Sequence, residues 1–246
     1  MSFNSAELMS IVISRALREG DVMITGTNAA FTCSAAFVAQ QCGRPRVSPV
    51  IGAFGTVDPK VQVAPRSGAD QAFIAGRIVT SLPDVVSDQV RGLADVICLG
   101  GLQVDRAGRV NLAVVGDHER PTLRGPGTIG IALISRLPRT FLYFEQHDPR
   151  TFVEAVDFVG GEGLREGGGI EIIVTPLAVL GPVEDHSRID LLSVHPGVSF
   201  EQVQERTGFP LDPARAVPTP EPTEEELAAL RRYPDGATLR EMDLVG

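Results

Sequence analysis

The sequence lacks several features that mark particular classes of protein. Its 246 residues include no tryptophan and two tyrosines. Basic side chains are scarce as well, because 22 lysines and arginines stand against 31 acidic residues and the net charge is −9. Neutralising a phosphate backbone takes clustered lysine and arginine, and single-stranded nucleic acids bind to stacked aromatic rings. We therefore expect no nucleic-acid partner.

Cysteines and long apolar runs are also few. Cys33, Cys42 and Cys98 are odd in number and show no C-x-x-C spacing, which is typical of small buried side chains in a reducing compartment. No apolar run approaches the ~18 residues of a membrane-spanning helix, and the first 21 residues lack a signal-peptide pattern. We expect a soluble cytoplasmic protein with no membrane contact.

The usual catalytic and metal-binding signatures are missing too. The chain has no G-x-S-x-G elbow and no phosphate-binding P-loop, and its histidines show no metal-ligand spacing. We expect no bound metal and a surface or structural role for each histidine: His118, His147, His186 and His195. Of these, His147 has one distinguishing feature, because it follows Glu145 at the expected end of a strand.

What is present is an alternation of helical and strand-like segments. We expect helices within residues 4–20, 27–43, 70–79 and 83–92, and strands within 21–26, 46–52, 94–101, 139–146, 151–159 and 170–183. Residues 102–116 read as a hairpin that turns at Gly108. This alternation predicts an α/β fold with a largely parallel sheet and helices on both faces.

The composition shifts after residue 211. Residues 217–222, V-P-T-P-E-P, predict an extended spacer, and Thr223 with Glu226 predicts a capping box that starts a short helix through Arg232. We therefore divide the chain into a domain over residues 1–211 and a C-terminal arm over 212–246.

Residues 125–130, Gly-Pro-Gly-Thr-Ile-Gly, match the dinucleotide fingerprint G-x-G-x-x-G. That fingerprint needs a buried strand directly before the first glycine, and the polar, proline-containing residues 116–124 predict none. Two interpretations stay open. The loop can present backbone N–H groups at a helix start to a phosphate or to the oxyanion of a thioester, or it can be a plain turn.

Three ordered segments carry a resemblance to a known family. Residues 100–117, GGLQVDRAGRVNLAVVGD, resemble the G-x-x-Q-V-D-x-x-G-x-x-N segment of the β subunits of family I coenzyme A transferases. Residues 150–159, RTFVEAVDFV, resemble a second segment of these subunits, and RGPGTIG at 124–130 stands where the family has a glycine-rich loop near the thioester. The resemblance covers about residues 5 to 200.

The resemblance implies a coenzyme A transferase fold and an acyl-CoA substrate, with no cofactor because CoA is part of that substrate. It also implies an α subunit as partner, in an α2β2 heterotetramer. The positions that it implies for substrate or CoA binding are Gly52, Gly101, Gln103, Asn111, Gly125, Gly127, Thr128 and Gly130. The residue types themselves favour a second role for Gln103, Asp105 and Asn111, which is to satisfy backbone groups at a tight corner.

The chain departs from the family at one decisive position. In these β subunits the strand matching residues 46–52 carries a glutamate two residues before a glycine, and this carboxylate takes CoA as an enzyme thioester. Here Val50 stands at that position if Gly52 is the family glycine, and no glutamate occurs between Gly43 and Ala72. Valine is not a nucleophile, so we assign no catalytic residue in this chain.

This departure resembles one branch of the family, the β subunits of actinobacterial steroid (cholesterol) ring-cleaving hydrolases. The resemblance to that branch implies hydrolytic carbon–carbon cleavage of a cyclic ketone in a CoA thioester, with the general base on the α subunit. Two alternatives stay open: a subunit of an acyl-CoA:carboxylate CoA-transferase that uses another residue, and a non-catalytic subunit that stabilises its partner.

Overall fold

The computed structural model describes residues 2–26, 30–51, 56–57, 78–79, 81–128, 130–134, 137–233, 239–242 and 244. They belong to two compact units. Unit 1 holds Met1–Leu99 together with Glu221–Leu244, and unit 2 holds Gly100–Pro220. The boundary predicted at residue 211 remains a prediction.

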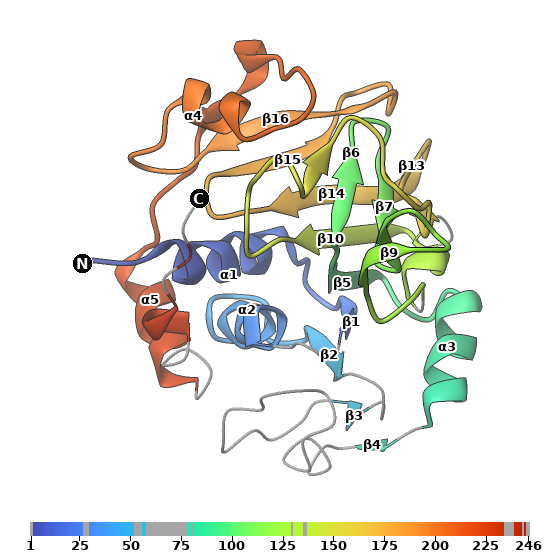
Figure 1. Cartoon of the computed structure of the whole chain (residues 1–246). Coiled ribbons are helices and arrows are strands. Elements are labelled where there is room, and N and C mark those ends of the chain that lie inside the picture. The colour runs from blue at the N-terminus through green and yellow to red at the C-terminus, as the bar shows by residue number, and fades with distance from the viewer. Residues whose placement is uncertain are drawn as a thin grey trace. The chain divides into compact units, whose positions relative to one another are not determined.

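The sheet of unit 1 is built around three parallel strands. They are β1 (Val22–Thr25), β2 (Ser48–Ile51) and β5 (Val96–Gly100), with β1 between the other two. Ile24 lies opposite Val50 on one side and Ile97 on the other. The short strands β3 (Thr56–Val57) and β4 (Ile78–Val79) continue the sheet beyond β2 in antiparallel pairing (Figure 1). Near-continuous apolar runs such as 94–99 are typical of strands buried on both faces.

The helices of unit 1 are α1 (Ser5–Ala16), α2 (Ala30–Gln41), α3 (Leu82–Val90) and α5 (Glu224–Arg232). Asn4 and Thr223 each close a capping box, so both predicted helix starts are confirmed. The helix expected over 70–79 lies mostly outside the described residues, and Ile78 and Val79 form β4 instead of helix.

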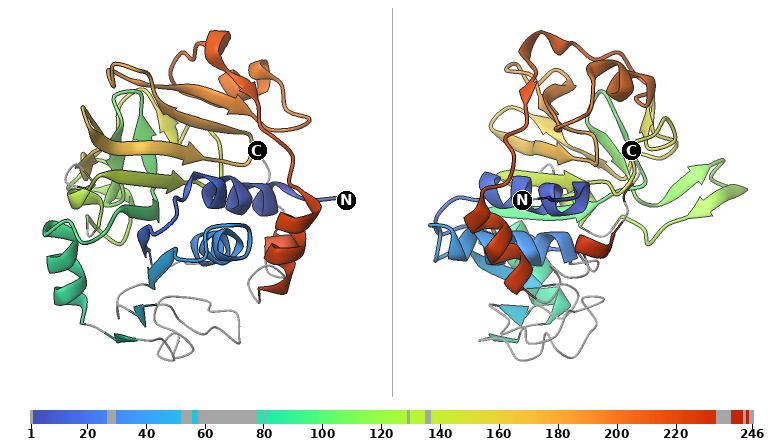
Figure 2. Two further views of the ribbon diagram at one scale, coloured as in Figure 1. Left: turned by 180° about the vertical axis from the view of Figure 1, so that it is seen from behind. Right: turned by 90° about the vertical axis from the view of Figure 1, so that its left-hand side faces the viewer.

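The C-terminal helix α5 packs against α1 and α2 (Figure 2). Two ion pairs join it to α1, from Arg15 to Glu226 at 2.7 Å and from Arg231 to the buried Glu7 at 2.8 Å. Residues 221–244 of the predicted C-terminal arm are therefore part of unit 1, with ion pairs that span more than two hundred residues of sequence, whereas residues 212–220 belong to unit 2.

Unit 2 contains most of the strands. Their bounds are β6 (Gln103–Asp105), β7 (Arg109–Asn111), β8 (Val114–Gly116), β9 (Pro121–Arg124), β10 (Arg139–Tyr143), β11 (Phe152–Val153), β12 (Gly161–Glu162), β13 (Leu164–Arg165), β14 (Gly168–Val174), β15 (Ala178–Pro182), β16 (Ile189–Val194) and β17 (Val217–Pro218). They are accompanied by α4 (Phe200–Glu205) and two 3-10 turns, η2 (Ile131–Leu133) and η3 (Pro213–Arg215).

The strands of unit 2 pair in three groups. The first runs in the order β17-β16-β15-β14-β10, in which β14 is parallel to β10 and antiparallel to β15. The second has the order β11-β6-β7-β12, and the third is the β8–β9 hairpin. The hairpin expected over 102–116 is confirmed as β6–β7, and Gly108 at its turn has a φ of 71°. The α/β class with a largely parallel central sheet is confirmed.

Two local expectations are wrong in unit 2. The helix expected after the glycine loop is only the 3-10 turn η2 among the described residues. The strand expected over 151–159 is limited to Phe152–Val153, because the chain turns away after β11. None of the helices among the described residues is long and apolar enough to cross a membrane.

Candidate functional site

Position 50, near the carboxyl end of β2, is occupied by an apolar residue with apolar partners in the strand register. Val50 is 9% exposed, with Ile24 of β1 beside it and Val57 of β3 on its other side. The acidic side chains Asp21 and Asp95 precede β1 and β5, so they lie at the opposite, amino ends of these parallel strands. Position 50 therefore brings no group that could attack a thioester. Gly52 lies outside the described residues.

A buried corner forms where β6 and β7 of unit 2 meet. Asn111 is fully buried and Gln103 is 4% exposed, and the amide of Asn111 donates to Gln103 Oε1 at 2.8 Å. Asp157 completes the corner: its backbone N–H donates to Gln103 Oε1, and its carboxylate accepts from Gln103 Nε2, both at 3.0 Å. Gln103 and Asn111 therefore have the structural role at a tight corner that their residue types favoured.

The corner leaves Asn111 no free polar atom. Both hydrogens of its amide are used, by Gln103 Oε1 and by the carbonyl of Val114, while Oδ1 accepts the N–H groups of Ala113 and Val114. A role in direct CoA binding therefore does not fit Asn111. Asp105 is similarly engaged, since its carboxylate accepts from the backbone and the guanidinium of Arg109.

The glycine loop comprises Gly125, Pro126, Gly127, Thr128 and Gly130 as the structure describes it. The N–H of Gly125 donates to the carbonyl of Ala113 at 2.8 Å, and that of Gly127 donates to the carbonyl of Leu112 at 3.3 Å. These two amides are used inside the chain, so the expected anion nest is not formed by them. Thr128 and Gly130 are half-buried, and Gly130 precedes η2 with a φ of 80°.

A strand does lead into this loop, contrary to the expectation. β9 ends at Arg124, directly before Gly125, but it pairs with β8 in a two-stranded hairpin whose Thr122 and Leu123 are exposed. The dinucleotide fingerprint requires a buried strand of a parallel sheet at this point. The match to G-x-G-x-x-G therefore carries no dinucleotide site.

Gly101 allows close packing of the backbone against Phe144 and Val110. A Cβ at this position would lie 3.0 Å from the ring of Phe144 and 3.3 Å from Val110 Cγ1. A side chain here would require Phe144 or Val110 to move by a few tenths of an ångström, so close packing is enough to account for the glycine without a ligand.

His147 and His195 are buried and fully hydrogen-bonded. His147 Nε2 lies 2.9 Å from Thr207 Oγ1 and its Nδ1 lies 2.9 Å from Thr175 Oγ1, while its ring stacks on Phe152 with 4.2 Å between the ring centroids. His195 Nε2 donates to the carbonyl of Thr175, and Nδ1 lies 3.0 Å from Thr219 Oγ1.

The surroundings keep both imidazoles neutral. Burial, together with the nearby Arg206, lowers the pKa of His147 to about 3, and burial lowers that of His195 to about 4. A general base needs a free ring nitrogen and a pKa near the working pH. Both histidines therefore have the structural role that the sequence predicted. His147 is not the general base that its position after Glu145 suggested.

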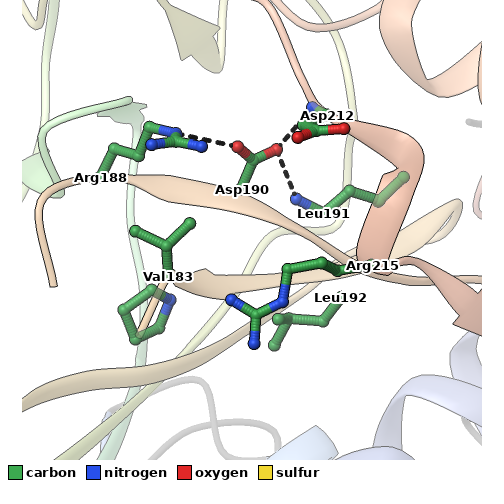
Figure 3. A pocket seen from close by; sticks show the side chains of 8 residues that line it. Val183, Arg188, Asp190, Leu191, Leu192, Asp212 and Arg215 are labelled. Atoms are coloured by element: carbon green, nitrogen blue, oxygen red, sulfur yellow. Dashed lines mark hydrogen bonds and ion pairs between the residues drawn. The ribbon is translucent and has the colours of Figure 1, made fainter. Parts of the chain in front are cut away.

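Unit 2 also contains a small pocket that the sequence did not indicate (Figure 3). At its wall Asp190 accepts the backbone N–H groups of Leu191 and Asp212 and the guanidinium of Arg188. Burial alone would raise the pKa of Asp190, but these bonds outweigh it and hold the pKa below its usual range. Arg215 is paired with Glu184 at 2.9 Å, so the charges around this pocket are compensated within the chain.

The comparison with known families agrees with the three sequence segments. The coenzyme A transferase family matches residues 8–206, which include Val50, the buried corner and the glycine loop. The chain belongs to the coenzyme A transferase family. The resemblance seen in the sequence is confirmed at this level.

Individual relatives divide between two activities. The chain is 32% identical to one of the subunits of the 3-oxoadipate CoA-transferase of Pseudomonas knackmussii, over 94% of this chain and 93% of the relative. It is also 32% identical to the cholesterol ring-cleaving hydrolase IpdB subunit of Rhodococcus jostii, over 60% of this chain and 62% of the relative.

Solved structures show the same fold along the chain. Glutaconate coenzyme A-transferase from Acidaminococcus fermentans superposes with a TM-score of 0.87 at 25% identity, covering 98% of each chain. The decarboxylase AibA/AibB superposes with a TM-score of 0.84 at 25% identity, covering 94% of each chain. Members of this family are enzymes or subunits of enzymes, and their reactions differ.

Proposed function

We propose that this chain is the β subunit of a cytoplasmic heteromeric hydrolase that opens a ring ketone of a steroid-derived CoA thioester by hydrolytic carbon–carbon cleavage. One observation carries the proposal. Val50 lies near the carboxyl end of β2, where the family's thioester-forming glutamate is expected, and its register partner on β1 is Ile24. Covalent CoA transfer through this position is not possible, because valine has no nucleophilic group.

The proposed reaction needs no covalent carboxylate. Water adds to the ring ketone, and the carbon–carbon bond breaks as in a reverse Claisen reaction, with its electron pair left as an enolate conjugated with the thioester. The enolate carbon then takes up a proton, and the former ketone becomes a carboxylate. These steps require a general base and stabilisation of the oxyanion.

The base is assigned to the partner subunit. His147 and His195 have no free ring nitrogen, and Asp190 is held ionised by donors on three sides. We propose an α2β2 assembly in which this chain contributes the scaffold. The part of the glycine loop around Thr128 and Gly130 would face the thioester side of CoA, since the amides of Gly125 and Gly127 are used internally. The contact of Gly52 with CoA stays a proposal from the family resemblance alone.

Two of the similar proteins have reactions other than CoA transfer. The hydrolase subunit IpdB of Rhodococcus jostii shares 32% of its residues with this chain over the matched region. The decarboxylase AibA/AibB has the same fold, so this scaffold is compatible with chemistry outside CoA transfer.

A second candidate is a CoA-transferase subunit that uses a residue other than position 50. It is favoured by the identity of 32% to the 3-oxoadipate transferase subunit, which extends over 94% of this chain. A third possibility, a subunit that only stabilises its partner, differs in that changes in the glycine loop would leave turnover intact.

Chemical trapping decides between hydrolysis and transfer. The complex is purified through a tag on this chain, incubated with acyl-CoA, treated with borohydride or hydroxylamine, and analysed by mass spectrometry. We expect no adduct on this chain and incorporation of one oxygen from ¹⁸O-labelled water into a ring-opened CoA product. A trapped glutamyl thioester on this chain would establish transfer and contradict the hydrolase.

A further inference from the structure

We propose that Asn111 is a positioning residue for the glycine loop and that Gln103 and Asp157 hold Asn111 in the required orientation. The inference rests on the proposed function, because it assumes that the loop faces the thioester. It replaces the direct CoA contact that the family resemblance implied for Gln103 and Asn111.

The first step concerns the chain after β7. Asn111 Oδ1 accepts the N–H groups of Ala113 at 2.9 Å and Val114 at 3.2 Å, while Nδ2 donates to the carbonyl of Val114 at 2.6 Å. One side chain thus fixes the conformation of residues 111–114. Asparagine supplies an acceptor and a donor on one short side chain, which this turn requires.

The second step concerns the carbonyls of that turn. Leu112 and Ala113 direct their carbonyl oxygens at the N–H groups of Gly127 and Gly125. The loop also rests directly on this turn, because a Cβ on Gly125 would lie 2.2 Å from the oxygen of Leu112. The direction of these two carbonyls therefore determines where the glycine loop sits.

The third step concerns the orientation of Asn111 itself. Gln103 Oε1 accepts from Asn111 Nδ2 at 2.8 Å and from the backbone N–H of Asp157 at 3.0 Å, and this fixes which end of each amide is oxygen. Asp157 accepts from Gln103 Nε2 and from the N–H of Gly116 at the end of β8. Asn111 is buried and uses all of its polar atoms, so this network holds one arrangement of its amide and rejects the flipped one, while the Asp157 carboxylate lies at the exposed end of the network.

The test uses the purified complex and two probes, acetyl-CoA and free CoA, whose affinities are measured by calorimetry. The two differ by the thioester group that the loop is proposed to face. We expect Asn111→Ala to weaken acetyl-CoA binding about tenfold while free CoA changes less than about threefold. Gln103→Met, which keeps the side-chain volume, should weaken acetyl-CoA binding about threefold. It provides the same comparison if Asn111→Ala fails to assemble.

A matched control is available in the same unit. Asp148 Oδ1 accepts the N–H groups of Arg150 and Thr151 in a turn of the same kind, and none of the hydrogen bonds among the described residues joins this turn to the glycine loop. Asp148→Ala should leave both affinities unchanged. Equal losses for the two probes, or no loss for either, would overturn the role of Asn111. A wild-type complex that binds neither probe would instead contradict the proposed function.

Discussion

Position 50 near the carboxyl end of β2 in unit 1 and the buried amides at the corner of β6 and β7 in unit 2 offer no free reactive group, for opposite reasons. At β2 the residue itself is inert, since Val50 is an alkyl side chain whose register partner on β1 is Ile24. At the corner Gln103 and Asn111 are polar, but they are hydrogen-bonded to each other and to the exposed Asp157. A polar cluster in a family motif is therefore no evidence of ligand contact until its hydrogen bonds are counted.

The two places also differ in how they tolerate change. An apolar strand end accepts other apolar side chains of similar volume at small cost. A saturated corner loses several bonds when one member is removed and leaves buried groups without partners. The following predictions test this difference, beginning with the largest effect.

Gly125→Ala should be the most damaging substitution in the glycine loop. The new methyl group would lie 2.2 Å from the carbonyl oxygen of Leu112, so backbone must move, and we expect the free energy of unfolding to fall by about 3 kcal/mol. The change is measured by urea denaturation of the purified complex.

Gly127→Ala is the matched control for that change. No atom lies within 4 Å of a Cβ at Gly127, and its φ of 101° alone opposes a side chain, at a cost of about 1 kcal/mol. If Gly125→Ala cost no more than Gly127→Ala, the loop would not rest on the turn that Asn111 fixes.

Val50→Glu tests the apolar strand end. A carboxyl group at this 9% exposed position would be taken out of water beside Ile24 of β1, and we expect the stability of the complex to fall by about 2–3 kcal/mol. Val50→Ile keeps the chemistry and should cost less than about 1.5 kcal/mol. A stable Val50→Glu complex that forms a trapped CoA thioester would mean that the partner subunit completes a polar site around position 50. That outcome would contradict the contrast between the end of β2 and the corner of β6 and β7.

The acid response of unit 2 should depend on His147. Its pKa is about 3 in the folded chain and 6.5 in the unfolded chain, so between these values only the unfolded chain takes up the proton. The stability that His147 contributes is therefore fully present above pH 6.5. It falls by about 1.4 kcal/mol per pH unit below that value, which is a loss of about 2 kcal/mol at pH 5.

His147→Gln should reduce the slope between pH 6 and pH 5 by about 1.4 kcal/mol per pH unit in denaturation experiments, and the part that remains comes from His195, whose pKa of about 4 adds a slope of the same size. His118→Asn, at an exposed histidine outside the buried network, should leave the slope unchanged. An unchanged slope in His147→Gln would show that another group controls the acid response.

Much of the fold could be predicted from residues close together in the sequence. The capping boxes at Asn4 and Thr223, the hairpin turn at Gly108 and the apolar strand of β5 each depend on fewer than ten consecutive residues. Local signals failed where the chain turns early. The run 151–159 is rich in valine and phenylalanine, as strands are, but the chain leaves the sheet after Val153, and Asp157 then reaches Gln103.

The family, the α/β class and the lack of a glutamate near position 50 follow from residue identity and short-range order alone. Which polar groups are already paired depends on how distant parts of the chain pack. Gln103 and Asp157 are 54 residues apart, His147 and Thr207 are 60 apart, and Arg15 and Glu226 are 211 apart. Such pairs meet through the packing of whole strands and helices, and their hydrogen bonds require atomic positions that no local pattern specifies.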